Sequence, residues 1–151
     1  MHESEPRDPE ELIAAQRDAR ARSLALVEDL AEHDWLGPKL AIVNPTRWEL
    51  GHVAWFQEKW CLRHLRGHAP LRADGDALYD SAAVLHDRRW ELELPDRAGT
   101  LEYARAVLAA VEAGLRGDGA LRPDARYFHL LALFHEDMHG EAFLYTRQTH
   151  A

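Results

Sequence analysis

FHLLALFHEDMHGEAFLYT, residues 128–146, contains two histidines, His135 and His139, four positions apart. On an α-helix, residues four apart lie one turn from each other on the same face, so both imidazoles can reach one point in space. Phe128 and Ala142 continue this face above and below the pair, as an apolar stripe that is typical of an inward-facing helix surface. The segment therefore predicts either a metal clamp or a buried polar pair.

A third imidazole decides in favour of metal, and the best candidate is His52 in the tryptophan-rich segment TRWELGHVAWFQEKW. A lone histidine on an apolar face is more often a hydrogen-bonded core residue, but a pair on one inner face favours metal. Three imidazole ligands leave coordination positions open, which indicates a reactive site. We expect His52, His135 and His139 to converge on one ion. Five other histidines are expected on the surface or in loops: His64, His68, His86, His129 and His150.

Composition excludes several classes of protein. The chain has 151 residues, enough for one domain with a sizeable core, and a formal net charge of −8 argues against a nucleic-acid surface. Its arginines are scattered among acids, which indicates solvated helix faces. The single cysteine, Cys61, excludes an internal disulfide, fits a reducing cytoplasm and is expected in the core. No apolar run is long enough for a membrane span, and the beginning of the chain has no hydrophobic signal core.

Helix starts are marked by an aspartate or asparagine beside a proline. Asp8-Pro9 and Asn44-Pro45 place a capping side chain before a proline, and Pro123-Asp124 opens a further apolar period. Gly67 and Gly117 are expected at helix ends. The sequence predicts helices near 9–32, 45–65, 100–116 and 124–149.

Residues 67–98 contain many Gly, Pro and Asp residues and show no sustained period, so they form a long connection between the second and third helices. No useful stretch alternates as a β-strand does. The predicted fold is all-α: a four-helix bundle with a long crossover between helices 2 and 3.

The five residues 135–139 also match H-E-x-x-H, the zinc-protease motif in which Glu136 would be the general base. One extension of that motif needs glycine and histidine where this chain has Ala142 and Tyr145. Such proteases also carry a β-sheet that this sequence does not predict. A zinc protease is therefore the weaker interpretation.

Two motifs together resemble a known family. Residues 44–56, NPTRWELGHVAWF, resemble the first metal motif of DinB-like bundles, and residues 135–142, HEDMHGEA, resemble the second, His-Glu-x-x-His-x-Glu. Within these bundles, the chain is most similar to the amino-terminal domain of ergothioneine-synthesis sulfoxide synthases and their selenoneine-synthase relatives. The resemblance covers nearly the whole chain in helix order.

The resemblance implies that His52, His135 and His139 bind a non-haem Fe(II), with open positions for O₂ and substrate. In that family the iron couples a thiol or a selenium donor to the imidazole carbon of hercynine, which is trimethylated histidine. The three imidazoles by themselves also accept other divalent metals such as Zn or Ni.

The resemblance also assigns a donor site. The ergothioneine branch binds its acidic sulfur donor through arginines in the long connection, where this chain offers Arg88 and Arg89. That branch usually has glutamine just before the last ligand, in contact with the substrate imidazole, where this chain has Met138. Met138 and the altered sequence pattern around Arg88 and Arg89 both depart from the ergothioneine branch, and they make the selenoneine-like branch at least as good a match.

The family's synthases continue into a formylglycine-enzyme-like domain that completes the pocket. We therefore expect residues 1–151 to bind metal but to be inactive alone, with an exposed apolar patch at the metal mouth and a tendency to form homo-oligomers. One alternative is a stand-alone DinB-like thiol S-transferase that uses a divalent metal to lower a thiol pKa. Another is a non-catalytic bundle kept for binding or dimerisation.

Overall fold

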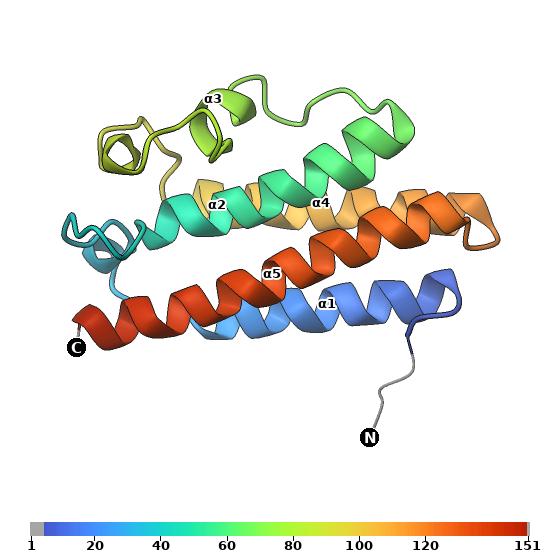
Figure 1. Cartoon of the computed structure of the whole chain (residues 1–151), viewed down its shortest axis with the longest axis horizontal. Coiled ribbons are helices and arrows are strands. Elements are labelled where there is room, and N and C mark those ends of the chain that lie inside the picture. The colour runs from blue at the N-terminus through green and yellow to red at the C-terminus, as the bar shows by residue number, and fades with distance from the viewer. Residues whose placement is uncertain (1–4, 151) are drawn as a thin grey trace.

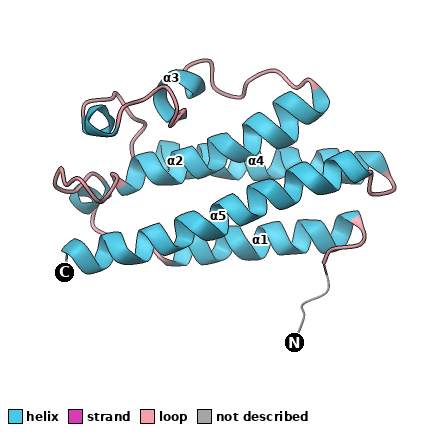
Figure 2. Ribbon diagram, in the orientation of Figure 1, coloured by secondary structure: helices cyan, strands magenta, loops and turns pink. Residues whose placement is uncertain are grey.

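Long helices arranged side by side make up most of the chain in this computed structural model, which describes residues 5–150 (Figure 1). Those residues contain no β-strand (Figure 2). The four long helices are α1 (Pro9–Ala25), α2 (Thr46–Gln57), α4 (Arg97–Asp118) and α5 (Pro123–His150). The π-helical segment η2 (Glu58–His64) continues α2. Three short helices lie in the connections: η1 (Glu32–Trp35), α3 (Gly75–Tyr79) and η3 (His86–Trp90).

The order of the helices explains the long crossover. In Figure 1, α2 and α4 run in the same direction beside each other, and so do α1 and α5. Two parallel neighbours cannot be joined by a tight turn, so the chain must travel back along the bundle between them. It does so through residues 65–96, which carry α3 over α2. The predicted all-α bundle with a long second connection is confirmed.

The first helix begins as predicted but ends early. The Asp8 side chain accepts a hydrogen bond from the Glu11 backbone N–H at 2.9 Å, and Pro9 takes the first helical position. The helix ends at Ala25 rather than near residue 32. The following turn brings Val27 into the core with Trp35, a long-range contact that local periodicity does not reveal.

The second helix begins without the predicted asparagine cap. It starts at Thr46 with Pro45 in the capping position and no capping side chain. Asn44 instead accepts a hydrogen bond from Arg89 Nη1 at 2.7 Å, so its side chain ties the crossover to the start of α2. Gly67 ends the π-helical continuation with φ = 64°, as expected of a glycine at a helix end.

The helix α4 starts earlier and ends later than predicted. Its capping residue is Asp96, whose side chain accepts from the Gly99 N–H at 2.8 Å, while Thr100 lies fully buried in the first turn. The helix continues past Gly117 to Asp118 and ends at Gly119, which has φ = 75°.

One arginine lies inside the bundle, although the scattered arginines indicated solvated helix faces. Arg20 of α1 is 4% exposed, and its guanidinium reaches each of the other three long helices. It donates to Glu136 Oε1 of α5, Gln57 Oε1 of α2 and the Ala104 carbonyl of α4, each at 2.8 Å. Ser23 adds a second hydrogen bond to the same Glu136 oxygen, at 3.1 Å. The four helices therefore meet at one charged group.

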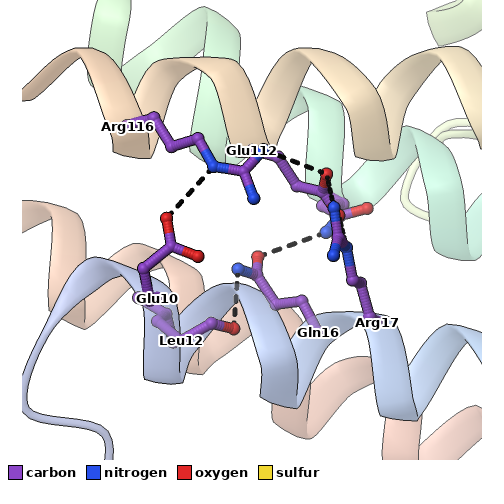
Figure 3. Close-up of polar contacts among 7 residues, drawn as sticks. Glu10, Leu12, Gln16, Arg17, Glu112 and Arg116 are labelled. Carbon is purple, nitrogen blue, oxygen red and sulfur yellow. Dashed lines mark hydrogen bonds and ion pairs between the residues drawn. The ribbon is translucent and has the colours of Figure 1, made fainter.

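A more exposed ion pair links α1 and α4 nearby. Figure 3 shows Arg17 and Glu112 pointing toward each other, with Nε–Oε1 and Nη2–Oε2 distances of 2.6 and 2.8 Å. The Arg17 side chain is 54% exposed, so solvent screens this pair. The pair offers a matched comparison for Arg20.

We expect Arg20→Met to lower the free energy of unfolding by about 3–5 kcal/mol, because it leaves the Glu136 carboxylate buried without its partner. Arg17→Met removes the same charge from the same helix and should cost much less, because its guanidinium is exposed to solvent and Arg116 remains 4.0 Å from the Glu112 carboxylate. Urea unfolding followed by circular dichroism measures both changes.

The double variant Arg20→Met with Glu136→Leu should recover a large part of the loss, because no uncompensated buried charge remains. Equal effects of Arg20→Met and Arg17→Met would contradict the central place given to Arg20.

Candidate metal centre

Three histidine side chains from two helices converge at the centre of the α2–α5 interface. His135 Nε2 lies 3.2 Å from His52 Nε2 and 3.1 Å from His139 Nε2. His52 is 3% exposed on α2, whereas His135 and His139 are half-buried on α5. The predicted convergence is present, and this trio is the group of potential metal ligands found among the described residues.

Hydrogen bonds at the far side of two rings set their tautomers. His52 Nδ1 donates to the Tyr79 carbonyl at 2.7 Å, and since a carbonyl only accepts, Nδ1 carries the proton. His139 Nδ1 lies 2.8 Å from the carboxylate of Glu49, which is 1% exposed and accepts from it. In each neutral ring the Nε2 atom then presents a lone pair to the centre of the cluster.

The donor set fits a divalent metal ion. Lone pairs that converge repel one another unless a cation lies between them, and nitrogen ligands ~2.1 Å from one ion lie roughly 3.0–3.4 Å apart. Burial lowers the pKa of His52 to about 4 and, with the neighbouring imidazoles, the pKa of His135 to about 2. Both rings are therefore neutral near pH 7, the form that binds metal.

Aromatic packing holds the ligand rings in place. The Phe56 ring lies on the His135 ring with centroids 3.7 Å apart and an interplanar angle of 8°. Trp48 stacks on His52 at 4.7 Å and 9°. Gly51 lets the crossover approach His52, because a Cβ at position 51 would lie 2.3 Å from Tyr79 Cε1. The ligand positions thus depend on the crossover as well as on the two helices.

The residues predicted to bind substrate lie at different places. Arg89 has its guanidinium carbon 3.8 Å from the Trp48 ring centroid and donates to Asn44 and to the Val84 carbonyl. Arg88 is on the surface, paired with Glu91 at 3.2 Å. Met138 is 59% exposed on α5. Arg89 is linked to His52 through the Trp48 ring, and the substrate roles of all three residues stay predictions.

The glutamate of the protease-like motif lies in the bundle interior. Glu136 is 4% exposed, and its Oε1 atom accepts from both Arg20 and Ser23. A carboxylate with these buried partners is not available as the base for a water molecule at the histidines. The glutamate of the H-E-x-x-H sequence is therefore explained by its buried pairing with Arg20 and Ser23.

Sequence reasoning missed Glu49 and misplaced His129. Glu49 precedes His52 by three positions, so the available signal was an acidic residue on the same predicted helix face as a ligand. His129 is fully buried rather than on the surface, with Nδ1 3.0 Å from Gln16 Oε1, and burial lowers its pKa to about 4. Cys61 lies in the core as predicted, and burial raises the pKa of its thiol to about 12.

Large apolar side chains are exposed along α5 beside the two ligands. Tyr127, Phe134, Met138 and Tyr145 are 62%, 64%, 59% and 45% exposed, respectively. Their spacing of seven, four and seven places them on one side of the helix, which we call the α5 apolar stripe. Within residues 5–150, none of the helices combines the length and apolar character needed to cross a membrane.

Comparison with known proteins agrees with the fold and the histidine cluster. Residues 17–143 match the DinB superfamily. The chain is 33% identical over 132 residues to a hercynine oxygenase of Mycolicibacterium smegmatis, covering 83% of this chain and 29% of the relative. It is 30% identical over 141 residues to a hercynine oxygenase of Mycobacterium tuberculosis, covering 90% of this chain and 32% of the relative. The chain thus spans about a third of the length of these relatives. With this match and an all-helical bundle around three histidines, the chain belongs to the DinB superfamily.

Proposed function

We propose that this chain is the iron-binding bundle of a non-haem Fe(II), O₂-dependent synthase that forms a C–S or C–Se bond on hercynine. The observation that carries the proposal is the convergence of the His52, His135 and His139 Nε2 atoms. Similarity to two proteins named hercynine oxygenase supports the choice of substrate. Iron is the metal that the O₂-dependent reaction requires, although the three imidazoles accept Zn or Ni as well.

When bound, iron supplies the redox chemistry by which O₂ oxidises the thiol or selenium donor. The chain's own residues orient the imidazoles, and burial keeps His52 and His135 neutral near pH 7. The Tyr79 carbonyl and Glu49 hold the protons of His52 and His139 on Nδ1, away from the metal side. Substrates are expected to approach from the partly exposed side of His135 and His139.

A second domain completes the proposed pocket. The relatives are about three times as long as the matched region, and the α5 apolar stripe lies beside the ligands. We propose that a formylglycine-enzyme-like domain covers this stripe and supplies the rest of the hercynine and donor site. In its absence, the stripe would favour homo-oligomers. We place the protein in the cytoplasm, a reducing compartment that suits its lone thiol, Cys61.

Protein purified without oxygen should bind about one Fe(II) per chain, and His52→Ala, His135→Ala or His139→Ala should each lose most of it. Glu49→Gln should weaken binding by roughly 10–100-fold, because it disturbs the hydrogen bond that orients His139. His68→Ala is the control, since His68 is exposed and its side chain bonds to the carbonyl of its neighbour Ala69. Metal analysis and isothermal titration give the occupancies and affinities. Full occupancy in His52→Ala would show that the three-histidine site is wrong.

Glu136→Gln separates this proposal from a zinc protease. We expect no peptidase activity from the Zn(II)-loaded wild type, because Glu136 is bonded to Arg20 and Ser23 inside the bundle. The substitution should change metal affinity only modestly, while weakening the buried ion pair and lowering the unfolding midpoint. Zinc-dependent peptide hydrolysis that disappears in Glu136→Gln would instead establish the protease.

Residues 1–151 alone should form no ergothioneine sulfoxide or selenoneine, because alignment of both substrates contributes several orders of magnitude to the rate and needs the second domain. The Fe(II)-loaded chain is incubated with hercynine, O₂ and either γ-glutamylcysteine or a selenosugar, and products are identified by mass. Efficient coupling would show that the bundle is a complete enzyme and would refute the role given to the second domain.

A further inference from the structure

Lys59 holds a positive charge against two indole rings, seven residues after His52, in the π-helical segment that continues α2. Its ammonium nitrogen lies 5.0 Å from the Trp55 ring centroid and 5.4 Å from the Trp60 ring centroid. Both indole faces attract a cation, so together they restrain the ammonium group. The side chain is half-buried.

One of these indoles contacts a metal-site histidine directly, and the other is linked to one through Phe56. The Trp55 ring lies against the His52 ring, with centroids 5.9 Å apart. The Trp60 ring lies 6.3 Å from Phe56, which in turn stacks on His135 at 3.7 Å. Lys59 therefore contacts two indoles of an aromatic cluster that also includes the His52 and His135 rings, and it lies in the segment that directly continues the helix carrying His52.

Within residues 5–150 the ammonium forms no ion pair with a carboxylate, although its charge is among the causes that lower the pKa of Asp76. Among the described residues, no Asp or Glu oxygen lies within 4.0 Å of Lys59 Nζ, and no hydrogen bond from it is present. The neighbouring carboxylate of Asp76 is already bonded to Arg63, at 2.6 and 3.0 Å, and to Trp55 Nε1, at 2.8 Å. By contrast, the chain's other lysine, Lys39, lies 4.0 Å from Glu91. Lys59 thus retains donors that an external anion can use.

The backbone at Lys59 is also irregular. The segment Glu58–His64 is π-helical, and such segments inside α-helices are frequent at functional sites. Buried contacts hold it in place: Glu58 accepts hydrogen bonds from the Tyr103 hydroxyl and from the Leu71 backbone N–H. Lys59 and Trp60 are therefore presented from a fixed support rather than from a frayed helix end.

We infer that Lys59 binds the carboxylate of a small imidazole-containing acid whose ring lies toward Phe56 and the metal centre. The inference rests on the proposed function in one respect, the choice of ligand. Hercynine is a histidine derivative and therefore carries both an imidazole ring and an α-carboxylate. Phe56 and Trp60 offer half-buried aromatic surface for the ring, and the restrained ammonium offers a charge-assisted hydrogen bond to the carboxylate.

The test uses the Zn(II)-loaded chain, which binds ligands without turnover, and three probes: hercynine, histidine and 4-methylimidazole, which lacks the carboxylate. Lys59→Met keeps the apolar stem and removes the charge. It should weaken binding of the acids by about tenfold and leave 4-methylimidazole unchanged. Lys59→Arg should restore most of the affinity. Lys39→Met is the matched control, because it removes the same charge elsewhere and should change nothing. Calorimetric titration gives the affinities, and the unfolding midpoint confirms that each variant is folded.

The outcomes separate the two proposals. If hercynine binds and Lys59→Met loses no affinity, the carboxylate site is wrong while the hercynine assignment stands. If histidine shows the Lys59-dependent advantage but hercynine does not bind, the carboxylate site stands and the proposed substrate is wrong. If neither acid binds more tightly than 4-methylimidazole to the wild type, the carboxylate site is wrong.

Discussion

The guanidinium of Arg20 is the contact on which the arrangement of the bundle most depends. It bonds to α2, α4 and α5 from α1, and its side chain and that of Glu136 are 4% and 5% exposed. Desolvating such a pair is costly, so its net contribution to stability is small compared with the penalty for separating it. The pair therefore restricts how the helices can rotate against one another. Because Glu136 directly follows His135, the same restriction sets the direction in which the first α5 ligand points.

The metal centre is assembled from three parts of the chain that are distant in sequence. Helix α5 supplies two imidazoles, α2 supplies the third together with Glu49, and the crossover supplies the Tyr79 carbonyl that bonds to His52. The crossover is held close by Gly51, where no Cβ fits beside the Tyr79 ring, and by the Asn44–Arg89 hydrogen bond. The long connection is thus part of the site rather than a link between helices.

Five residues at the centre of α5 satisfy two motifs with different chemistry. H-E-x-x-H in a zinc protease needs a glutamate that reaches the water at the metal. Here the two histidines lie on the face toward α2, and the intervening Glu136 lies one residue further round the helix, paired with Arg20. The two sequence motifs coincide because both place two histidine ligands four residues apart on one face of a helix. The partner on a neighbouring helix decides which chemistry the glutamate can perform.

The sequence alone determined the features that depend on neighbours along the chain. Apolar periods and the Asp8 cap located the long helices, and the spacing of His135 and His139 with His52 identified the histidine cluster. Tertiary structure alone decided the partners of polar groups: the burial of Arg20 and His129, the bond from His139 to Glu49, and the setting of Lys59 between two indoles. The reason is physical. Helical periodicity is a local property, whereas a charged or polar side chain becomes buried only when a distant segment supplies its partner, and the sequence around Arg20 is that of an ordinary solvated helix face.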